Sequence, residues 1–464
     1  MADIFVIDDQ APEDMAMLQA LYSRSPASVV SHLEKLKAVG SGKFMEQYYV
    51  GYGHASIGDC GMTTVFIEQV SMLVAKAVQD NPLYSGQEAS TRYLDFSRQA
   101  LHDPYNHPAS AAILADWMKL YNATLPKLVE GLKKQYPFDP AQYKTEKVWS
   151  NALNARAFDI ARSLLPVGTT TLLSWTTNLR QARDHLRRLK HHPLAEVRAV
   201  AQDIFAGLYL KYPNSFKADD MTRADSRDAY AGQFTTTSYV AKADDVIARN
   251  TLSAAELAQL AKGEVIARRT ALDLEGLRRN EQEVLASRPS GSALPWRLEA
   301  YGRYNLFFLL DFGSFRDIQR HRNGVCQIPV LDARFGLHPW YRQQYAQLLG
   351  PADLAALDEQ FEALLERVKA LPQQGIVTSD LNDQYLLPMG LSALVGVSYS
   401  VPQMVYVGEL RSGKTVHGSL RPIAQKMLKL VQADLPGIAI HGDFDVDDWS
   451  AKRGEQTIAE KQSA

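Results

Sequence analysis

The sequence contains little that would cross-link it, charge it strongly or hold it in a membrane. It has two cysteines, Cys60 and Cys326, so no disulfide framework is expected and a reducing compartment is favoured. Its formal charge of −2 at pH 7 does not indicate a nucleic-acid partner or an anionic membrane surface. No apolar run approaches the roughly 18–20 residues of a membrane helix, and residues 1–20 lack the pattern of a signal peptide.

The composition that remains is that of a globular protein. Hydrophobic residues make up 46% and charged residues 22% of the 464 residues, enough for two to four domains with packed cores. We therefore predict a cytoplasmic protein. Any anion-binding site in it has to come from a local cluster of cations.

An internal repeat is present at a period of more than 200 residues. Arg198-Ala-Val-Ala-Gln and Arg421-Pro-Ile-Ala-Gln each precede a proline by 15 residues from the arginine (213 − 198 and 436 − 421). Upstream, Leu164-Leu-Pro-Val-Gly is echoed by Leu386-Leu-Pro-Met-Gly. Both matches occur in the same order, which predicts a domain duplication and not a solenoid.

The repeat divides the chain into three parts. We assign the first copy to residues 1–225, a helical connector to residues 226–284 and the second copy, with an acidic tail, to residues 285–464. Residues 63–70 have the composition of a strand, followed by a helical pattern to 78, and residues 108–135, 179–212 and 353–370 are typical of amphipathic helices. This mixture predicts an α+β fold present in two copies.

Two polar segments are the candidates for chemistry. Residues 85–93, Ser-Gly-Gln-Glu-Ala-Ser-Thr-Arg-Tyr, place a hydroxyl two positions before an arginine beside a glycine turn, which suits a phosphate. Arg320-His321-Arg322 concentrates cations next to an apolar stretch and suits a pyrophosphate or a reduced flavin ring. Each segment also has an ordinary interpretation, as a solvated turn and as an ion-paired helix end respectively.

Together these segments resemble the flavin-dependent thymidylate synthases. That family carries one continuous signature: R-H-R, two residues, S, one residue, N-E, one residue, S, one residue, R-Y. Here it is divided between the copies. Counting back from Ser90, the R-H-R position of the first copy falls on residues 80–82, Asp-Asn-Pro, and counting forward from Arg320, the S-x-R position of the second copy falls on residues 330–332, Val-Leu-Asp.

Other family motifs follow the same division. Gly53-His54-Ala-Ser56-Ile-Gly-Asp59-Cys60 resembles the family's G-H-x-S-x-x-E-H, and Arg162-Ser-Leu-Leu-Pro with Asn178-Leu-Arg180 resembles its R-x-x-L-P and N-x-R. The second copy lacks these but keeps the late L-R of the family as Leu410-Arg411. Each copy thus retains what the other has lost.

The resemblance implies two tandem thymidylate-synthase-like domains that form a pseudo-dimer, and a homodimer that mimics the family's tetramer. It implies flavin-dependent methylation at C5 of a pyrimidine nucleotide such as dUMP, with FAD as cofactor and with methylenetetrahydrofolate and NADPH as co-substrates. The implied catalytic residue is Arg411, near the uracil ring. The implied substrate-binding residues are Ser90, Thr91, Arg92, Arg162 and Arg411, and the implied flavin-binding residues are His54, Ser56, Gln87, Glu88, Asn178, Arg180, Arg320, His321 and Arg322.

Departures from the signature leave alternatives open. The family has Gln three residues before R-H-R, where this chain has Asp317, and Gln87, Asp59 and Cys60 replace Asn, Glu and His. A related flavoenzyme acting on another pyrimidine, or a homologue that binds flavin and nucleotide without turnover, is the alternative.

Three remaining clusters are expected to be structural. His185, His191 and His192 are expected to be solvated and not to bind metal, because Pro193 interrupts helical spacing. Cys326 is expected to be a buried structural thiol and not a nucleophile. The acidic run of His441, Asp443, Asp445, Asp447 and Asp448 is expected to be a solvated, frayed tail.

Overall fold

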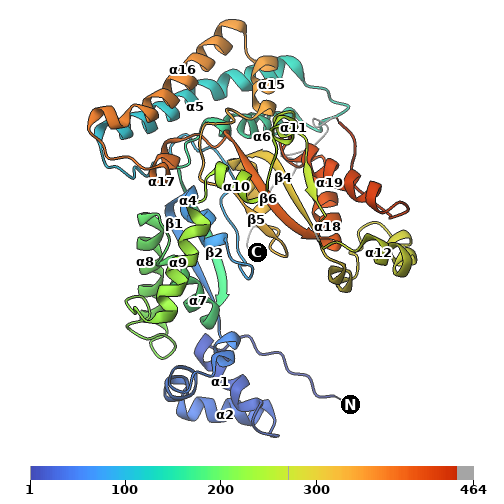
Figure 1. Ribbon diagram of the computed structural model, residues 1–464. Helices are drawn as coiled ribbons and strands as arrows, with labels where there is room; N and C mark the ends of the chain where they lie inside the picture. Colours follow the sequence, from blue (N-terminus) through green and yellow to red (C-terminus); the bar gives the residue numbers. More distant parts are fainter. Residues whose placement is uncertain (1, 93, 270, 447–464) are drawn as a thin grey trace. The chain divides into compact units, whose positions relative to one another are not determined.

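The computed structural model describes residues 2–92, 94–269 and 271–446, with all their side chains except those of residues 235–238. Tyr93, Asp447 and Asp448, which the sequence analysis singled out, lie outside these residues. The chain forms two compact units (Figure 1). The first consists of Met1–Ala89 and Thr170–Val240, and the second of Ser90–Thr169 and Ala241–Ala464. Each unit therefore combines segments that are far apart in the sequence.

The first unit is built on a strand pair. β1 (Met62–Ser71) and β2 (Thr170–Asn178) are antiparallel, with an irregularity between Ile67 and Val70. Thr63 and Val65 are part-buried and Ile67 is buried, whereas Phe66 on the opposite face is 75% exposed. The other elements are α1 (Pro12–Tyr22), α2 (Val29–Val39), α3 (Gly42–Phe44), a π-helix (Met45–Gly51), a 3₁₀-helix (Ala55–Cys60), α4 (Met72–Gln79), α7 (Leu179–Leu189), α8 (Ala195–Lys211) and α9 (Ser226–Tyr239).

The second unit contains an antiparallel sheet whose described strands are ordered β3-β4-β6-β5. β4 (Arg303–Asp311) and β6 (Ser392–Ser400) are central, and β3 (Ile266–Arg268) and β5 (Val325–Gln327) lie at the edges. Leu306, Phe308 and Leu310 pack on one face with residues of α18 (Val401–Ser412) and α19 (Arg421–Asp434). Phe307 and Leu309 pack on the other face with residues of α10 (Ala243–Arg249) and α11 (Ala254–Ala261). The sheet is thus covered on both faces.

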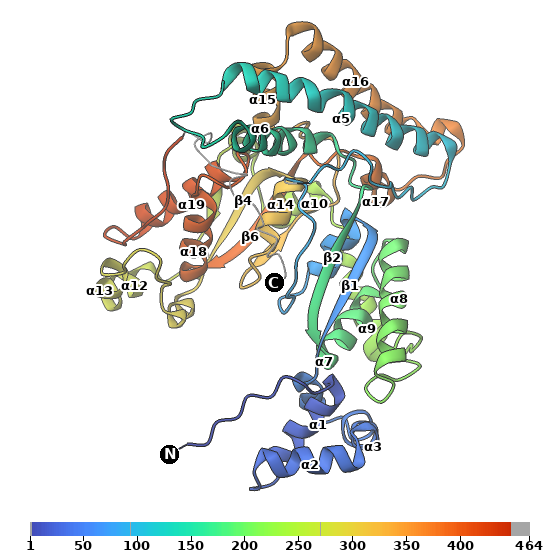
Figure 2. The same cartoon turned by 180° about the vertical axis from the view of Figure 1, so that it is seen from behind.

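Helices surround this sheet. The long α5 (Pro108–Gln135) lies beside α16 (Pro351–Lys369), as both views show (Figures 1 and 2). Trp117 of α5 is fully buried and its indole nitrogen donates to the carbonyl of Leu386 over 2.9 Å. The remaining elements are α6 (Glu146–Ala161), α12 (Leu274–Asn280), α13 (Gln282–Ala286), α14 (Phe312–Gln319), α15 (Pro339–Leu348), α17 (Asp380–Asp383) and 3₁₀-helices at Arg162–Leu164, Trp296–Tyr301, Leu371–Gln374 and Gln384–Leu386.

One local device recurs at four strand ends. Ser71, Asn178, Asp311 and Ser400 each end a strand, and each side chain accepts a hydrogen bond from the backbone nitrogen three residues into the following helix. Such residues satisfy an otherwise unpaired helix donor and stabilise a helix by about 1 kcal/mol. The strand-to-helix transitions of the two predicted copies therefore use the same chemistry.

The repeated Leu-Leu-Pro segments meet each other inside the second unit. The nitrogen of Val167 donates to the carbonyl of Leu387, and that of Met389 donates to the carbonyl of Leu165, both over 2.8 Å. In the repeat, residue 167 corresponds to residue 389 and residue 165 to residue 387. Each of the two hydrogen bonds is therefore the equivalent of the other, with the two copies interchanged. Reciprocal contacts of this kind are characteristic of a two-fold axis. They support the predicted duplication, which stays a prediction.

Several predicted elements are found and others need correction. The strand and helix at 62–79 and the helices at 108–135 and 351–369 are present. The single helix predicted at 179–212 is wrong, because Pro193 lies in a break between α7 and α8. In the tail predicted to fray from 441, Asp443 pairs with Arg421 at 3.2 Å and Asp445 pairs with Lys414 at 3.3 Å. The predicted helical connector also supplies β3 to the sheet.

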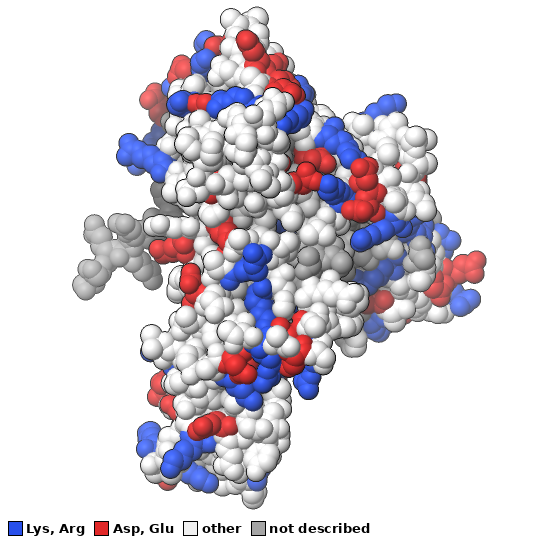
Figure 3. All heavy atoms as spheres, turned by 60° about the vertical axis from the view of Figure 1, so that its left-hand side comes forward, with Lys and Arg blue, Asp and Glu red and all other residues white. Residues whose placement is uncertain are grey.

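The surface agrees with the balanced composition. Basic and acidic side chains are interspersed over the face seen in Figure 3. Within the part of the chain that the structure describes, no helix has the combination of length and apolar character needed to cross a membrane.

Candidate anion-binding site in the second unit

Arg92 forms a buried ion pair within the second unit. Its Nε and Nη2 atoms donate to the two carboxylate oxygens of Asp159, on α6, over 2.7 and 3.1 Å, and Nη2 also donates to the carbonyl of Thr415 over 3.1 Å. Asp159 is 1% exposed. Burial lowers the pKa of Arg92, but Asp159 outweighs it and the net shift is upward. The bidentate pair fixes the plane of the guanidinium.

Ser90 and Thr91 precede this arginine in the same turn. The Ser90 hydroxyl accepts from the backbone nitrogen of Arg92 over 3.3 Å, and the Thr91 side chain is buried. The turn therefore holds Arg92 from its own backbone as well as through its side chain.

The cationic triplet lies at the end of α14. Arg411 of α18 donates from Nε to His321 Nε2 over 2.8 Å and from Nη2 to the carbonyl of Asp317 over 2.9 Å. Because Nε2 of His321 accepts, this ring is neutral. Burial first and Arg411 second lower the pKa of His321 to about 3. Arg320 is exposed, and its Nε is 3.8 Å from an Asp317 carboxylate oxygen.

Asp317 interacts with arginines from both predicted copies. Its side chain is 8% exposed. Burial raises its pKa, but four guanidinium groups outweigh this and keep it below its usual value. They are, in order of effect, those of Arg92, Arg320, Arg162 and Arg411. Two of these arginines come from the first predicted copy and two from the second. Arginines of both predicted copies thus act on one buried carboxylate.

Arg162 is held inside the protein. It is 1% exposed, and it donates from Nε to the Tyr341 hydroxyl over 3.2 Å and from Nη2 to the Ser314 hydroxyl over 2.7 Å. Its Nη2 is also 3.5 Å from a carboxylate oxygen of Asp311. Through Ser314 and Asp311, Arg162 holds the start of α14. Its predicted contact with substrate stays a prediction.

A buried polar network, which the sequence analysis missed, supports these arginines. His417, which is fully buried, bonds to Ser419 over 2.9 Å and to the carbonyl of Asp159 over 3.0 Å. The Ser419 hydroxyl donates to Asp311 over 2.5 Å, and the Tyr341 hydroxyl donates to the same carboxylate over 3.0 Å. Desolvation lowers the pKa of His417 well below its usual value. The network connects the partner of Arg92 to the partner of Arg162.

The remaining predicted flavin residues belong to the first unit. His54 and Ser56 are exposed at the start of the 3₁₀-helix, and the side chain of Asn178 caps α7. Arg180 pairs with Asp59 at 2.7 Å. Glu88 accepts from Gln79 over 2.7 Å, and Gln87 bonds through its backbone to β2. Their part in flavin binding stays a prediction.

The clusters expected to be structural have partners. His185 and His192 are 2% and 4% exposed, so the prediction that they are solvated is wrong. His185 is buried and forms a hydrogen bond with the carbonyl of Val78 over 3.0 Å. Cys326 is half-buried, with its thiol 3.2 Å from the Tyr399 hydroxyl. Among the described residues, no group of His, Cys, Asp and Glu has the arrangement of a metal site.

Comparison with known proteins agrees with the motifs in the first copy. Residues 6–214 match the family of the thymidylate synthase complementing protein. The family resemblance predicted from the sequence is thereby confirmed over these residues. The match includes Ser90, Arg92 and Arg162; in the structure both arginines belong to the cluster around Asp317.

Relatives of similar length are found as well. A UPF0159 protein of Thermoplasma acidophilum is 22% identical over 92% of this chain and 94% of its own. A UPF0159 protein of Chlamydia pneumoniae is 24% identical over 84% of this chain and 78% of its own. A third, from Chlamydia muridarum, is 28% identical over 37% of this chain and 34% of its own. Two of these similarities therefore extend well beyond the part that matches the thymidylate synthase complementing protein family.

Proposed function

We propose that the protein is a flavin-dependent methyltransferase that acts at C5 of a pyrimidine nucleotide, through one site shared by the two copies. Methylenetetrahydrofolate would donate the one-carbon unit and NADPH would be the reductant. The observation that carries the proposal is that arginines of both copies surround Asp317. Arg411 donates to its carbonyl over 2.9 Å, Arg320 is 3.8 Å from its carboxylate, and the charge of Arg92 lowers the pKa of the same carboxylate. The family match over residues 6–214 supports the reaction class.

The donor set suits an anionic ligand. Arg92 uses Nε and Nη2 for Asp159, which leaves the Nη1 side of a fixed, planar guanidinium for a phosphate oxygen. Arg320 is exposed, and its ion pair with Asp317 is long, at 3.8 Å. Arg92 is thus preorganised, and a preorganised cation binds an anion without the cost of ordering it first.

The residues at the end of α14 also fit a flavin. Arg320, His321 and Arg322 would hold it, since a reduced flavin ring and a pyrophosphate are both anionic and a neutral His321 keeps a ring N–H to donate. When bound, the flavin supplies the hydride for the reaction. The flavin-binding roles that the family resemblance implies for residues of the first unit stay predictions; these residues are His54, Ser56, Gln87, Glu88, Asn178 and Arg180.

Arg411 is the residue to which we assign the catalytic role. Two of its nitrogens donate to His321 and Asp317, and these hydrogen bonds fix the orientation of its guanidinium. A fixed positive charge beside a uracil oxygen stabilises the negative charge that develops on the ring during methylation. The neutral, buried His321 thus acts as a positioning residue for Arg411.

One experiment tests the reaction. The purified protein is first examined for flavin absorbance. It is then incubated with NADPH, labelled methylenetetrahydrofolate and a panel of pyrimidine nucleotides and nucleosides, and the products are analysed by mass spectrometry. Label transferred to a pyrimidine, together with NADPH oxidation that accelerates when the pyrimidine is added, supports the proposal. Bound flavin without any pyrimidine-dependent oxidation would favour a binding homologue instead.

A further inference from the structure

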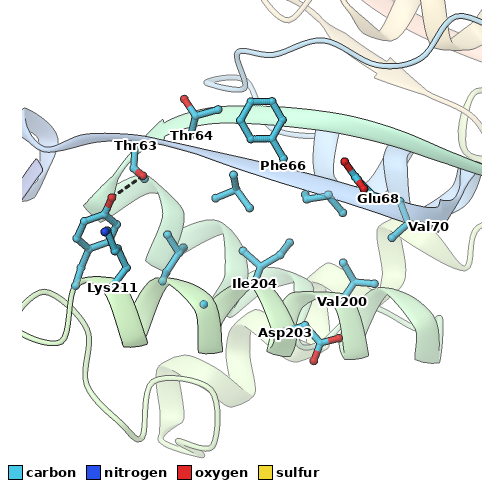
Figure 4. A pocket seen from close by; sticks show the side chains of 14 residues that line it. Thr63, Thr64, Phe66, Glu68, Val70, Val200, Asp203, Ile204 and Lys211 are labelled. Carbon is cyan, nitrogen blue, oxygen red and sulfur yellow. Dashed lines mark hydrogen bonds between the residues drawn. The ribbon is translucent and has the colours of Figure 1, made fainter.

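A groove of about 560 Å³ runs along the outer edge of β1 in the first unit, with α8 as its other wall (Figure 4). Consecutive residues from Thr63 to Glu68 line it, as is expected where the edge of a strand and not its face is exposed. β2 pairs with the opposite edge. Among the described residues no strand pairs with β1 on the groove side.

The corresponding edge in the second unit is filled. β4 corresponds to β1, since each ends at a residue that caps the next helix, and α19 corresponds to α8 through the repeated Arg198 and Arg421 segments. There β3 pairs antiparallel with β4. Lys426 of α19 donates to the carbonyl of Gly263 over 2.5 Å, and Arg269 donates to Asp434 over 2.6 Å, so both flanks of β3 are fastened to α19.

A segment of the first unit lies as far before the next helix as β3 does in the second unit. β3 ends at Arg268, six residues before the first residue of α12, and Val6 lies six residues before the first residue of α1 (274 − 268 and 12 − 6). The segment Ile4-Phe5-Val6 is apolar and β-prone, yet these side chains are 85%, 53% and 89% exposed. An exposed apolar segment and an open strand edge are each costly in water.

The segment can reach the groove within its own chain. Pro12 lies beside Gly61, one residue before β1 begins, because a Cβ on Gly61 would be 2.6 Å from the Pro12 carbonyl oxygen. Eight extended residues back to Ile4 span roughly 26 Å, whereas the six residues of chain from Gly61 to Ile67 span roughly 20 Å. The direction of travel makes the pairing antiparallel, as it is for β3.

We propose that Ile4–Val6 adds to the outer edge of β1 as an antiparallel strand and closes this groove, as β3 does in the second unit. Phe5 or its neighbours would cover Val200 and Ile204 of α8, which face the groove (Figure 4). Main-chain hydrogen bonds to the edge of β1 supply the pairing and the apolar side chains supply the fit. The full chain therefore has a bound and a released state of its first residues.

Hydrogen exchange on the full-length protein tests the pairing. The backbone amides of residues 63–67 are expected to exchange on the order of tenfold faster in Phe5→Asp than in the unsubstituted protein. Val377→Asp, which replaces another exposed apolar side chain (94% exposed), is the matched control and is expected to change nothing at β1. Equal exchange in all three proteins would overturn the proposal.

A second variant blocks the groove without touching the segment. A Cβ on Gly207 meets no atom within 4 Å, and Gly207 lines the groove from α8. Gly207→Phe is therefore expected to fill the space, leave α8 folded and speed proteolysis and exchange of residues 4–6. If residues 4–6 are equally accessible in this variant and in the unsubstituted protein, the groove does not bind them. Protection that disappears on dilution would mean that a second copy supplies the strand, which contradicts pairing within the chain.

Discussion

At the scale of single residues, Asp317 sets the charge of the candidate site. Its carboxylate is buried among Arg92, Arg320 and Arg411 and neutralises part of their positive charge. A unit charge at about 5 Å contributes on the order of 3 kcal/mol at an effective dielectric constant near 20. We expect Asp317→Asn to tighten the binding of a nucleotide monophosphate by on the order of tenfold to a hundredfold, measured by calorimetry.

The control for this prediction is the exposed Asp358→Asn, which removes the same charge from the surface. It is expected to leave the affinity unchanged. Weaker binding in Asp317→Asn would show that the carboxylate accepts a hydrogen bond from the ligand and does not oppose its charge.

Arg92 has a structural role as well as the proposed binding role. Arg92→Ala leaves Asp159, which is 1% exposed, without its bidentate partner, and breaking such a pair costs about 3–5 kcal/mol of stability. We expect a lower urea midpoint and loss of nucleotide binding. The double variant Arg92→Ala/Asp159→Asn removes the unpaired charge, so stability should be partly regained while binding stays lost. Recovered nucleotide binding in the double variant would contradict the assignment of Arg92 to the ligand.

At the scale of elements, the crossing of the two Leu-Leu-Pro segments depends on glycine. A Cβ on Gly390 would be 2.4 Å from Cβ of Ser163 and 2.8 Å from its carbonyl oxygen, too close without movement of both segments. We expect Gly390→Ala to lower the free energy of unfolding by about 1–3 kcal/mol, measured by urea denaturation. Gly413→Ala is the matched control, because its nearest neighbour would be at 3.8 Å. Equal stability of the two variants would mean that the crossing can separate at little cost.

The helices and strands could be predicted from the sequence, but the pairing of the two Leu-Leu-Pro segments could not. Capping residues and periodicity predict β1 with α4, α5 and α16, and the repeat identifies residues 164–168 and 386–390 as equivalent. Nothing in a single sequence states that equivalent segments pair with each other, because pairing across a two-fold axis depends on how the copies dock. The connector strand β3 was missed for a related reason. Three residues are too few to show an alternating pattern.

The candidate site shows the same limit. Arg92, Arg320 and Arg411 could be predicted from the divided signature, because each copy keeps residues that the other lacks. The buried residues around them could not be predicted, because they stand outside any motif. These are Asp159, which pairs with Arg92, Asp311, which pairs with Arg162, and His417, which bonds to the Asp159 carbonyl. Arg162 was identified, but its hydrogen bonds to Tyr341 and Ser314 were not expected. Burial of a charged side chain is a tertiary property, and residue type does not reveal it.

At the scale of the whole molecule, both units contain histidines that are held neutral. Burial is the main cause that lowers the pKa of His185 and His192 in the first unit, and of His321 in the second, to about 3. In the unfolded chain each titrates near 6.5. Between these two values the unfolded chain binds protons that the folded chain does not, so the stability present above about pH 6.5 is lost as the pH falls toward 3.

We therefore expect the urea midpoint of the whole protein to fall steeply between pH 6.5 and pH 4, with each neutral histidine contributing up to about 1.4 kcal/mol per pH unit. His185→Gln removes one of these groups and should flatten the pH dependence by that amount, although it also lowers stability at pH 7. Ile204→Val, a mild core substitution worth about 0.5–1.5 kcal/mol, controls for that loss and should keep the original slope. If His185→Gln and Ile204→Val give the same slope, acid sensitivity arises from the carboxylates, and the buried histidines of the two units are not its source.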